Sequence, residues 1–234
     1  MPLFEVTDDG LQRRPPAAFA ALGMYERADL QRLLRDDIAA LDEDLLVIAE
    51  EYGNWEDARR RIDLLAIDKA SRLVVIELKR TDDGGHMELQ ALRYAAMVAS
   101  MGFSEVAEAF AAHRAKHGHV DDGSARTELA TFLDVADGPE DPVISTDVRI
   151  LLVSADFGRE ITTTVLWLNA FEGMDIRCVR LVPYEIENRV LLDIQQVLPL
   201  PEAADYQVRL RRKDVARERA RNDGRDFTRY HIVV

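Results

Sequence analysis

Three charged residues stand inside otherwise apolar sequence and could carry chemistry together. Asp63 lies in the segment IDLLAID, whereas Glu77 and Lys79 lie in RLVVIELKR. Side chains alternate across a strand, so Glu77 and Lys79 should point to the same face. Burying a carboxylate or an ammonium group is costly unless the group is paired or binds a metal. The three residues therefore predict either a structural ion pair near a strand end or a metal site.

The second carboxylate favours the metal site. A lone E-x-K on a strand is more often a structural ion pair. Two carboxylates that converge repel each other, however, and a divalent cation relieves that repulsion. Oxygen ligands of this kind suit Mg²⁺ or Mn²⁺. Such a cation can polarise a phosphoryl oxygen and lower the pKa of a bound water, while Lys79 orients that water or stabilises the developing charge.

A hairpin would bring the two carboxylates together. Strands are predicted at residues 45–52, 62–68 and 72–80. The polar link Lys69-Ala70-Ser71 is so short that the second and third strands must be antiparallel neighbours. The continuous apolar run from Leu73 to Ile76 is typical of a central strand covered on both faces.

Two predicted helices flank this hairpin. In the segment 25–41, apolar residues recur every three or four positions, and Glu26 falls on that apolar stripe rather than on the solvated face. The segment 86–101 is predicted as a second helix, with Gln90 and Tyr94 along one side. Both Glu26 and Gln90 should therefore face inward, toward the charged positions of the hairpin.

The remaining elements complete an α/β pattern. Further helices are predicted at 104–117, 124–136 and 160–171, and further strands at 149–155, 176–182 and 190–198. This order predicts one α/β layered domain with a mixed central sheet flanked by helices. We place an extended or loosely packed arm at 1–23, the main domain at 24–198 with an inserted helical segment at about 104–137, and an Arg-rich extension at 199–234.

The motif and its surroundings resemble a known family. The pattern I-D-x(13)-E-x-K on adjacent strands resembles the PD-(D/E)XK nuclease superfamily, whose fold is restriction-endonuclease-like. The longer text RIDLLAIDKASRLVVIELKR, followed by ELQALRY, is similar to the nuclease domain of NucS-type endonucleases. The resemblance covers residues 24–101. Ile62 stands where the family name has a proline, at a position that varies in the superfamily.

The resemblance implies a role for each matching residue. Asp63 and Glu77 become metal ligands, joined by the backbone carbonyl of Leu78, and Lys79 becomes the catalytic lysine. Glu26 becomes the acidic residue carried by the preceding helix. Gln90 becomes the polar residue of a Q-x-x-x-Y helix, with Tyr94 beside it.

The implied activity is a divalent-metal-dependent DNA endonuclease with Mg²⁺ or Mn²⁺ as cofactor, acting on branched, single-stranded or mismatched DNA in repair or defence. The alternative is a catalytically silent nuclease-fold module that binds DNA or regulates. The retained Asp63, Glu77 and Lys79 favour the enzyme, and no aromatic platform favours RNA. Many related nucleases are dimers, so a homodimer is one option.

The charge distribution bears on how DNA would be held. The net charge is −13, which argues against binding nucleic acid by overall charge. Residues 209–225 carry a net charge of +5, and they predict either a phosphate-contacting arm or a segment docked on acidic protein surface. The candidate DNA-contacting residues are Arg80, Tyr94, Arg209, Arg211, Arg212 and Lys213.

Other residues suggest simpler roles. The spacing of His113, His117 and His119 resembles a metal site, but their polar segment favours a solvated helix face. Trp167 and Cys178 are expected in the core. A single cysteine excludes an internal disulfide and indicates a reducing, cytoplasmic setting. Neither a signal peptide nor a membrane-spanning run is expected.

Overall fold

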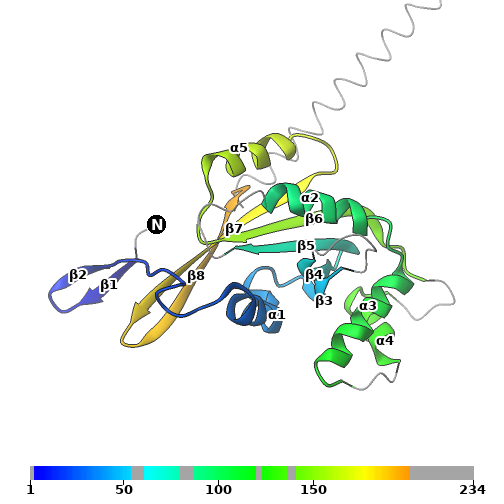
Figure 1. Ribbon diagram of the computed structural model, residues 1–234, viewed down its shortest axis with the longest axis horizontal. Helices are drawn as coiled ribbons and strands as arrows, with labels where there is room; N and C mark the ends of the chain where they lie inside the picture. Colours follow the sequence, from blue (N-terminus) through cyan, green and yellow to red (C-terminus); the bar gives the residue numbers. More distant parts are fainter. Residues whose placement is uncertain (1–2, 54–60, 80–86, 120–122, 136–140, 201–234) are drawn as a thin grey trace, which may run out of the picture.

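The structure of the protein is a computed structural model (Figure 1). It describes residues 3–53, 61–79, 87–119, 123–135 and 141–200. The strands β3 to β8 form a six-stranded sheet in their sequence order. Their bounds are Leu45–Tyr52 for β3, Ile62–Asp68 for β4, Arg72–Lys79 for β5, Ser145–Ser154 for β6, Asp175–Ile186 for β7 and Arg189–Leu198 for β8.

The sheet is mixed. β4 is antiparallel to both of its neighbours, β3 and β5. β5, β6 and β7 are mutually parallel, and β8 returns antiparallel to β7. Glu187 and Asn188 form the β7–β8 turn with φ of 51° and 59°, the left-handed backbone conformation that tight hairpin turns require. The prediction of an α/β domain with a mixed central sheet flanked by helices is confirmed, and this arrangement is consistent with a restriction-endonuclease-like fold.

Helices cover both faces of the sheet (Figure 1). One face packs against α2, α3, α4 and α5, which span Met87–Val98, Phe103–Lys116, Ser124–Phe132 and Arg159–Leu168. The other face packs against a short helical stretch made of η1, α1 and η2, at Glu26–Gln31, Arg32–Asp36 and Ile38–Ala40.

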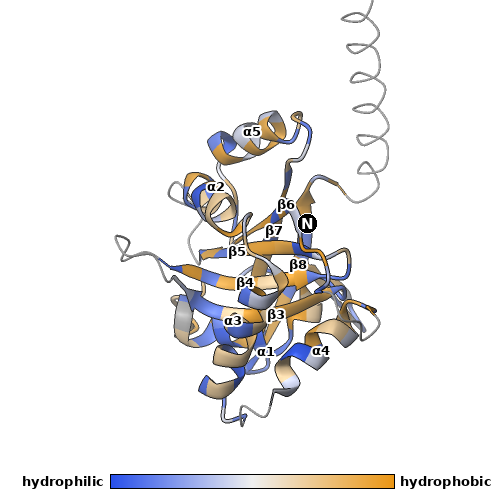
Figure 2. Cartoon of the chain, turned by 90° about the vertical axis from the view of Figure 1, so that its right-hand side faces the viewer, coloured by the Kyte–Doolittle hydropathy of each residue, from blue (hydrophilic) through white to orange (hydrophobic). Residues whose placement is uncertain are grey.

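Burial on both faces explains the composition of the central strands. Every residue of β4 is buried, and so are Leu73 to Leu78 of β5. Leu65 and Val75 belong to the core under α2, whereas Leu64 and Ile76 belong to the core under α1. The strands accordingly appear largely hydrophobic along their length (Figure 2). Charged residues on β4 and β5 are therefore costly exceptions, and they need partners.

The N-terminal residues are more ordered than the sequence predicted. Leu3–Thr7 (β1) and Gly10–Arg14 (β2) form an antiparallel hairpin of mainly exposed residues. Phe19 is only 2% exposed and packs in the core beside Leu30. The hairpin fits the extended form of the predicted arm, whereas the buried ring of Phe19 ties the end of the segment to the domain.

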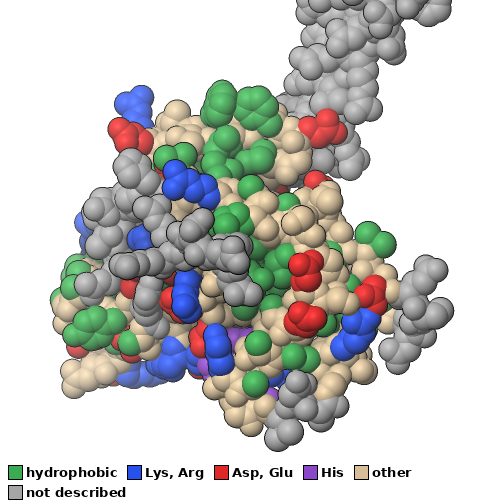
Figure 3. Space-filling model, turned by 45° about the vertical axis from the view of Figure 1, so that its right-hand side comes forward, with side chains coloured by type: hydrophobic (Ala, Val, Ile, Leu, Met, Phe, Trp, Pro, Cys, Tyr) green, Lys and Arg blue, Asp and Glu red, His purple; other side chains and the backbone are tan. Residues whose placement is uncertain are grey.

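Two helix predictions also need correction. The single helix expected at 25–41 is divided, and the chain leaves helical geometry at Asp37, where φ is −136°. Trp167, expected in the core, is 62% exposed, and Figure 3 shows hydrophobic side chains gathered where α5 lies. Trp167 follows Val165 by two residues, so it lies roughly 200° around α5 from Val165, which is buried together with Ile161. Cys178 is buried, as predicted.

Candidate active site

The β4–β5 hairpin places Asp63 and Glu77 opposite one another. The paired residues of the two strands extend from Ile67–Leu73 to Leu64–Ile76. Asp63 and Glu77 are the next residues beyond that last pair, and directly opposed residues share a face of the sheet. Their exposed fractions are 6% and 0%. The carboxylates therefore meet in a buried place, as the sequence predicted.

Backbone groups of Leu78 border the Asp63 carboxylate. The Leu78 amide donates a hydrogen bond of 2.8 Å to Asp63 Oδ2. In a β-strand, the N–H and C=O of one residue point to the same edge. The Leu78 carbonyl is therefore directed toward β4, on the side where Asp63 lies, and beyond the last β4–β5 pair.

Glu77 is held from the following helix. Gln90 Nε2 on α2 donates to Glu77 Oε2 at 2.9 Å and to the Tyr94 hydroxyl at 3.3 Å. Glu77 Oε1 is buried and has no hydrogen-bond partner among the residues that the structure describes. A buried polar atom without a partner is costly, so this oxygen is a candidate for binding a cation.

Burial and mutual repulsion make both carboxylates reluctant to ionise. Desolvation raises the pKa of Asp63 to about 6, against the opposing effect of the Leu78 amide and Lys79. Desolvation, followed by the negative charge of Asp63, raises the pKa of Glu77 to about 9. A divalent cation would reverse both effects, because it favours the charged form of each oxygen ligand.

Lys79 lies at the end of β5, next to Glu26 of η1. Its Nζ is 3.4 Å from Glu26 Oε1, and both side chains are 28% exposed. The positive charge of Lys79 partly offsets the rise in the pKa of both Asp63 and Glu77. The sequence thus predicted correctly that Glu26 and Gln90 face the charged positions, one from each flanking helix.

The sequence interpretation overlooked Glu51. Pairing of Glu50 with Leu64 and of Tyr52 with Ile62 brackets Glu51 opposite Asp63. Its negative charge contributes to the raised pKa of Asp63. Glu51 has a φ of 49°, an unusual backbone conformation for a strand residue. The available signal was an acidic pair ending a strand next to the one that carries Asp63.

The predicted DNA-contacting residues lie mostly outside the described part of the chain. These are Arg80, Arg209, Arg211, Arg212 and Lys213. Tyr94 is described, but it is only 3% exposed and contacts Gln90 through its hydroxyl. Its position fits support of Gln90 better than contact with DNA.

The histidines correct another prediction. His113 is partly buried and His117 contacts Glu50, so these two do not form a purely solvated helix face. His119 is exposed, as expected.

Comparisons with known proteins give one structural neighbour and no family. No family model and no curated protein sequence matches the chain. Among solved structures, the chain is similar to a repair endonuclease from Pyrococcus abyssi at 17% sequence identity and a TM-score of 0.37, over 67% of this chain and 47% of that one. The match thus spans less than half of that protein. Among the described residues, no helix is long and apolar enough to cross a membrane.

Proposed function

We propose that this protein is a divalent-metal-dependent nuclease that hydrolyses phosphodiester bonds in DNA. The observation that carries the proposal is the pair of buried, opposed carboxylates of Asp63 and Glu77, with one Glu77 oxygen left without a hydrogen-bond partner among the described residues. The Lys79 ammonium group contacts Glu26. An ion pair alone therefore does not explain why the carboxylates of Asp63 and Glu77 are buried opposite one another.

The residues fit a hard divalent cation. Asp63 and Glu77 would supply carboxylate oxygens and Leu78 its backbone carbonyl, and oxygen ligands suit Mg²⁺ or Mn²⁺. Gln90 donates to one oxygen of Glu77 and so leaves the other directed elsewhere. A bound cation would polarise the phosphoryl group and lower the pKa of the attacking water.

Lys79 and Glu26 would act beside this cation. The Lys79 ammonium group lies on the same face of β5 as Glu77, where it can orient the attacking water and stabilise negative charge on the phosphoryl oxygens. The contact with Glu26 restricts the flexible lysine side chain. A lysine ammonium group carries three N–H groups, so Lys79 has donors beyond its contact with Glu26.

The substrate class rests on the sequence resemblance to NucS-type endonucleases, which favours branched, single-stranded or mismatched DNA. A panel assay tests it. The purified full chain is incubated with labelled single-stranded, duplex, flap and mismatched DNA of one sequence, with Mg²⁺, Mn²⁺ or EDTA. We expect metal-dependent cleavage that is strongest on a structured or single-stranded substrate. Binding of these DNAs without cleavage under any metal would instead favour the silent DNA-binding or regulatory module.

A further inference from the structure

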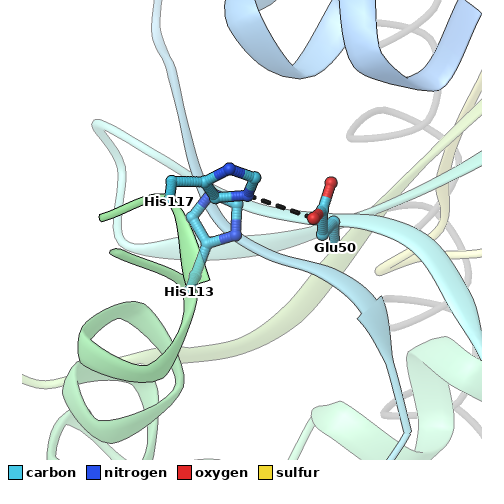
Figure 4. A group of neighbouring side chains, drawn as sticks. All are labelled: Glu50, His113 and His117. Atoms are coloured by element: carbon cyan, nitrogen blue, oxygen red, sulfur yellow. Dashed lines mark hydrogen bonds and ion pairs between the residues drawn. The ribbon is translucent and has the colours of Figure 1, made fainter. Parts of the chain in front are cut away.

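A second group of potential metal ligands lies between β3 and α3. Glu50 Oε1 is 3.0 Å from His117 Nε2, and His113 lies one helical turn before His117. One ligand atom from each residue lies within 4.8 Å of the others. The three side chains point toward one another: His113 from α3, His117 from the residue that caps its C-terminus, and Glu50 from β3 (Figure 4). None of the three belongs to the Asp63–Glu77 site.

The helix spacing aligns the imidazoles. Residues four apart lie on the same face of a helix, and the two ring centroids are 4.7 Å apart with planes at 63°. A tetrahedral cation bound at about 2.0–2.1 Å separates its ligand atoms by roughly 3.3 Å. The Glu50–His117 separation of 3.0 Å is already close to that value. The His113 ligand atom lies within 4.8 Å of the other two and would have to move closer to them on binding.

One ring nitrogen of His113, Nδ1, is buried without a hydrogen-bond partner among the described residues. Burial, the largest cause, together with the nearby positive groups lowers the pKa of His113 to about 4. A buried imidazole nitrogen without a hydrogen-bond partner is a candidate metal ligand.

The negative charge of Glu50 is already paired with Arg35, so its contact with His117 is not needed to neutralise it. Arg35 donates to Glu50 Oε2 at 2.8 Å, so Glu50 already has a cationic partner. Its other oxygen, Oε1, is the one directed at His117. A ligating carboxylate whose second oxygen is held by hydrogen bonding is a common arrangement around protein-bound metals.

Solvent can reach the cluster. Glu50 and His113 line a pocket of about 420 Å³ together with Glu105 and Glu108, and the His117 side chain is 30% exposed. Histidine side chains are visible at the surface among charged ones (Figure 3). A cation could therefore enter, and water could complete its coordination.

We propose that Glu50, His113 and His117 bind a transition-metal cation of the Zn²⁺ type, in a site distinct from that of Asp63 and Glu77. Two imidazoles and a carboxylate suit Zn²⁺ and Co²⁺, whereas Mg²⁺ prefers oxygen ligands. The bound cation would fasten the last turn of α3 to β3. Through Arg35 the same carboxylate is already linked to α1.

Cobalt titration tests this site without reference to nuclease activity. The full chain carrying Asp63→Asn and Glu77→Gln is titrated with Co²⁺, with the visible absorption of nitrogen-ligated Co²⁺ as the readout. We expect one equivalent to bind, Zn²⁺ to displace it and excess Mg²⁺ to leave it in place. His113→Gln and His117→Gln should each weaken binding at least about tenfold, whereas His119→Gln, on the neighbouring exposed histidine, should leave it unchanged.

Circular dichroism of each variant checks that the fold is intact, and Zn²⁺ should raise the melting temperature of the parent but not of the His113 variant. The proposal is overturned if Co²⁺ does not bind, if Mg²⁺ displaces it, or if both histidine variants bind it like the parent. Because the titrated chain lacks both carboxylates of the proposed nuclease site, its outcome is independent of whether the protein cleaves DNA.

Discussion

At the scale of single residues, the two buried carboxylates oppose folding unless a cation accompanies them. Glu77 is fully buried beside Asp63, and desolvation disfavours its charged form. Such a cost persists in proteins mainly where the group has a function. Replacing one of these carboxylates with a neutral side chain should therefore stabilise the metal-free protein and, in the presence of metal, lower its activity.

Glu77→Gln tests that opposition. Gln keeps the shape of the side chain and its contact with Gln90 but removes the carboxyl group, which in the metal-free protein must either be desolvated or take up a proton on folding. We expect the metal-free protein to gain roughly 1–3 kcal/mol in free energy of unfolding at neutral pH, because each unit of pKa shift corresponds to about 1.4 kcal/mol. Urea denaturation with EDTA measures this. Adding Mn²⁺ should stabilise the wild type and not the variant; equal stabilisation of both would place the metal elsewhere.

Lys79→Met separates chemistry from folding. Removal of one stabilising charge near the reacting phosphoryl group should lower kcat about 10²- to 10³-fold. Divalent-metal binding, measured by calorimetry, should remain. Lys69→Met, on the exposed β4–β5 turn, is the matched control and should retain full turnover. Normal turnover with a lowered melting temperature in Lys79→Met would identify the Glu26 contact as a structural ion pair.

Gln90 is a positioning residue, since it acts through Glu77. Gln90→Leu keeps the side-chain bulk but removes the 2.9 Å hydrogen bond to Glu77. We expect a loss of about 10–100-fold in metal affinity or activity, with much of it recovered at high Mg²⁺ concentration. Leu89→Ala, on the exposed side of α2, serves as the control. If activity falls but its Mg²⁺ dependence is unchanged, Gln90 does not orient Glu77.

At the scale of elements, the two ends of the β4–β5 hairpin have different tasks. One end carries Asp63 and Glu77. The other carries Asp68, which accepts hydrogen bonds from Arg72 at 2.9 Å and from Arg149 at 3.0 Å. Asp68 and Arg149 are 2% and 3% exposed. This buried, fully charged network joins β4, β5 and β6, and it explains a charged residue on a central strand without invoking catalysis.

The Asp68 end should control acid stability. Hydrogen bonds from Arg72 and Arg149 outweigh burial and lower the pKa of Asp68. A lowered carboxyl pKa contributes stability that is present above the unfolded-state value and is lost as the pH falls through the folded-state value. Asp68→Asn should therefore cost about 3–5 kcal/mol at pH 7, and the difference from wild type should shrink in acid. Urea denaturation across this pH range measures it.

A matched control for the network is Asp44→Asn, because Asp44 is exposed near the same sheet edge. It should change stability little at any pH. A constant difference between Asp68→Asn and wild type from neutral to strongly acidic pH would contradict the assignment of the shift to the Arg149 network.

Elements with strong local signals could be predicted from the sequence, and elements decided by distant contacts could not. The hairpin followed from a three-residue link and the apolar run from Leu73 to Ile76. The burial of Phe19 depends on which surfaces meet in three dimensions. The exposure of Trp167, in contrast, follows from its position on the side of α5 opposite Ile161 and Val165. The site was predictable where charges interrupt apolar strands. Glu51 was overlooked although an acidic pair near a strand end signalled it. The Glu50–His117 contact was not predictable, because it joins β3 to the end of α3 and no local pattern indicates that pairing.

At the scale of the whole molecule, an acidic chain must gather positive charge locally to hold DNA. The net charge is −13, whereas residues 209–225 carry +5. This segment lies outside the described residues, so its role stays a prediction from sequence. Each phosphate neutralised by a basic side chain steepens the salt dependence of DNA binding by about one unit.

Truncation after Pro201 tests the segment. We expect weaker DNA binding, a flatter dependence of the binding constant on salt, and unchanged metal binding. Fluorescence anisotropy at several salt concentrations gives both affinity and slope. The segment is structural if the truncated protein unfolds or changes its oligomeric state while the salt dependence of its DNA-binding constant stays the same. In that case other arginines hold the DNA.

The central claim is that Asp63 and Glu77 together hold the cation that drives hydrolysis. Its most direct test is the initial rate of DNA cleavage as a function of Mn²⁺ concentration, for the wild type and for Glu77→Gln. The wild type should show saturable, EDTA-sensitive cleavage, and the variant should show none at any Mn²⁺ concentration while remaining folded. Cleavage by Glu77→Gln at the wild-type rate, or wild-type cleavage that persists in excess EDTA, would contradict the claim.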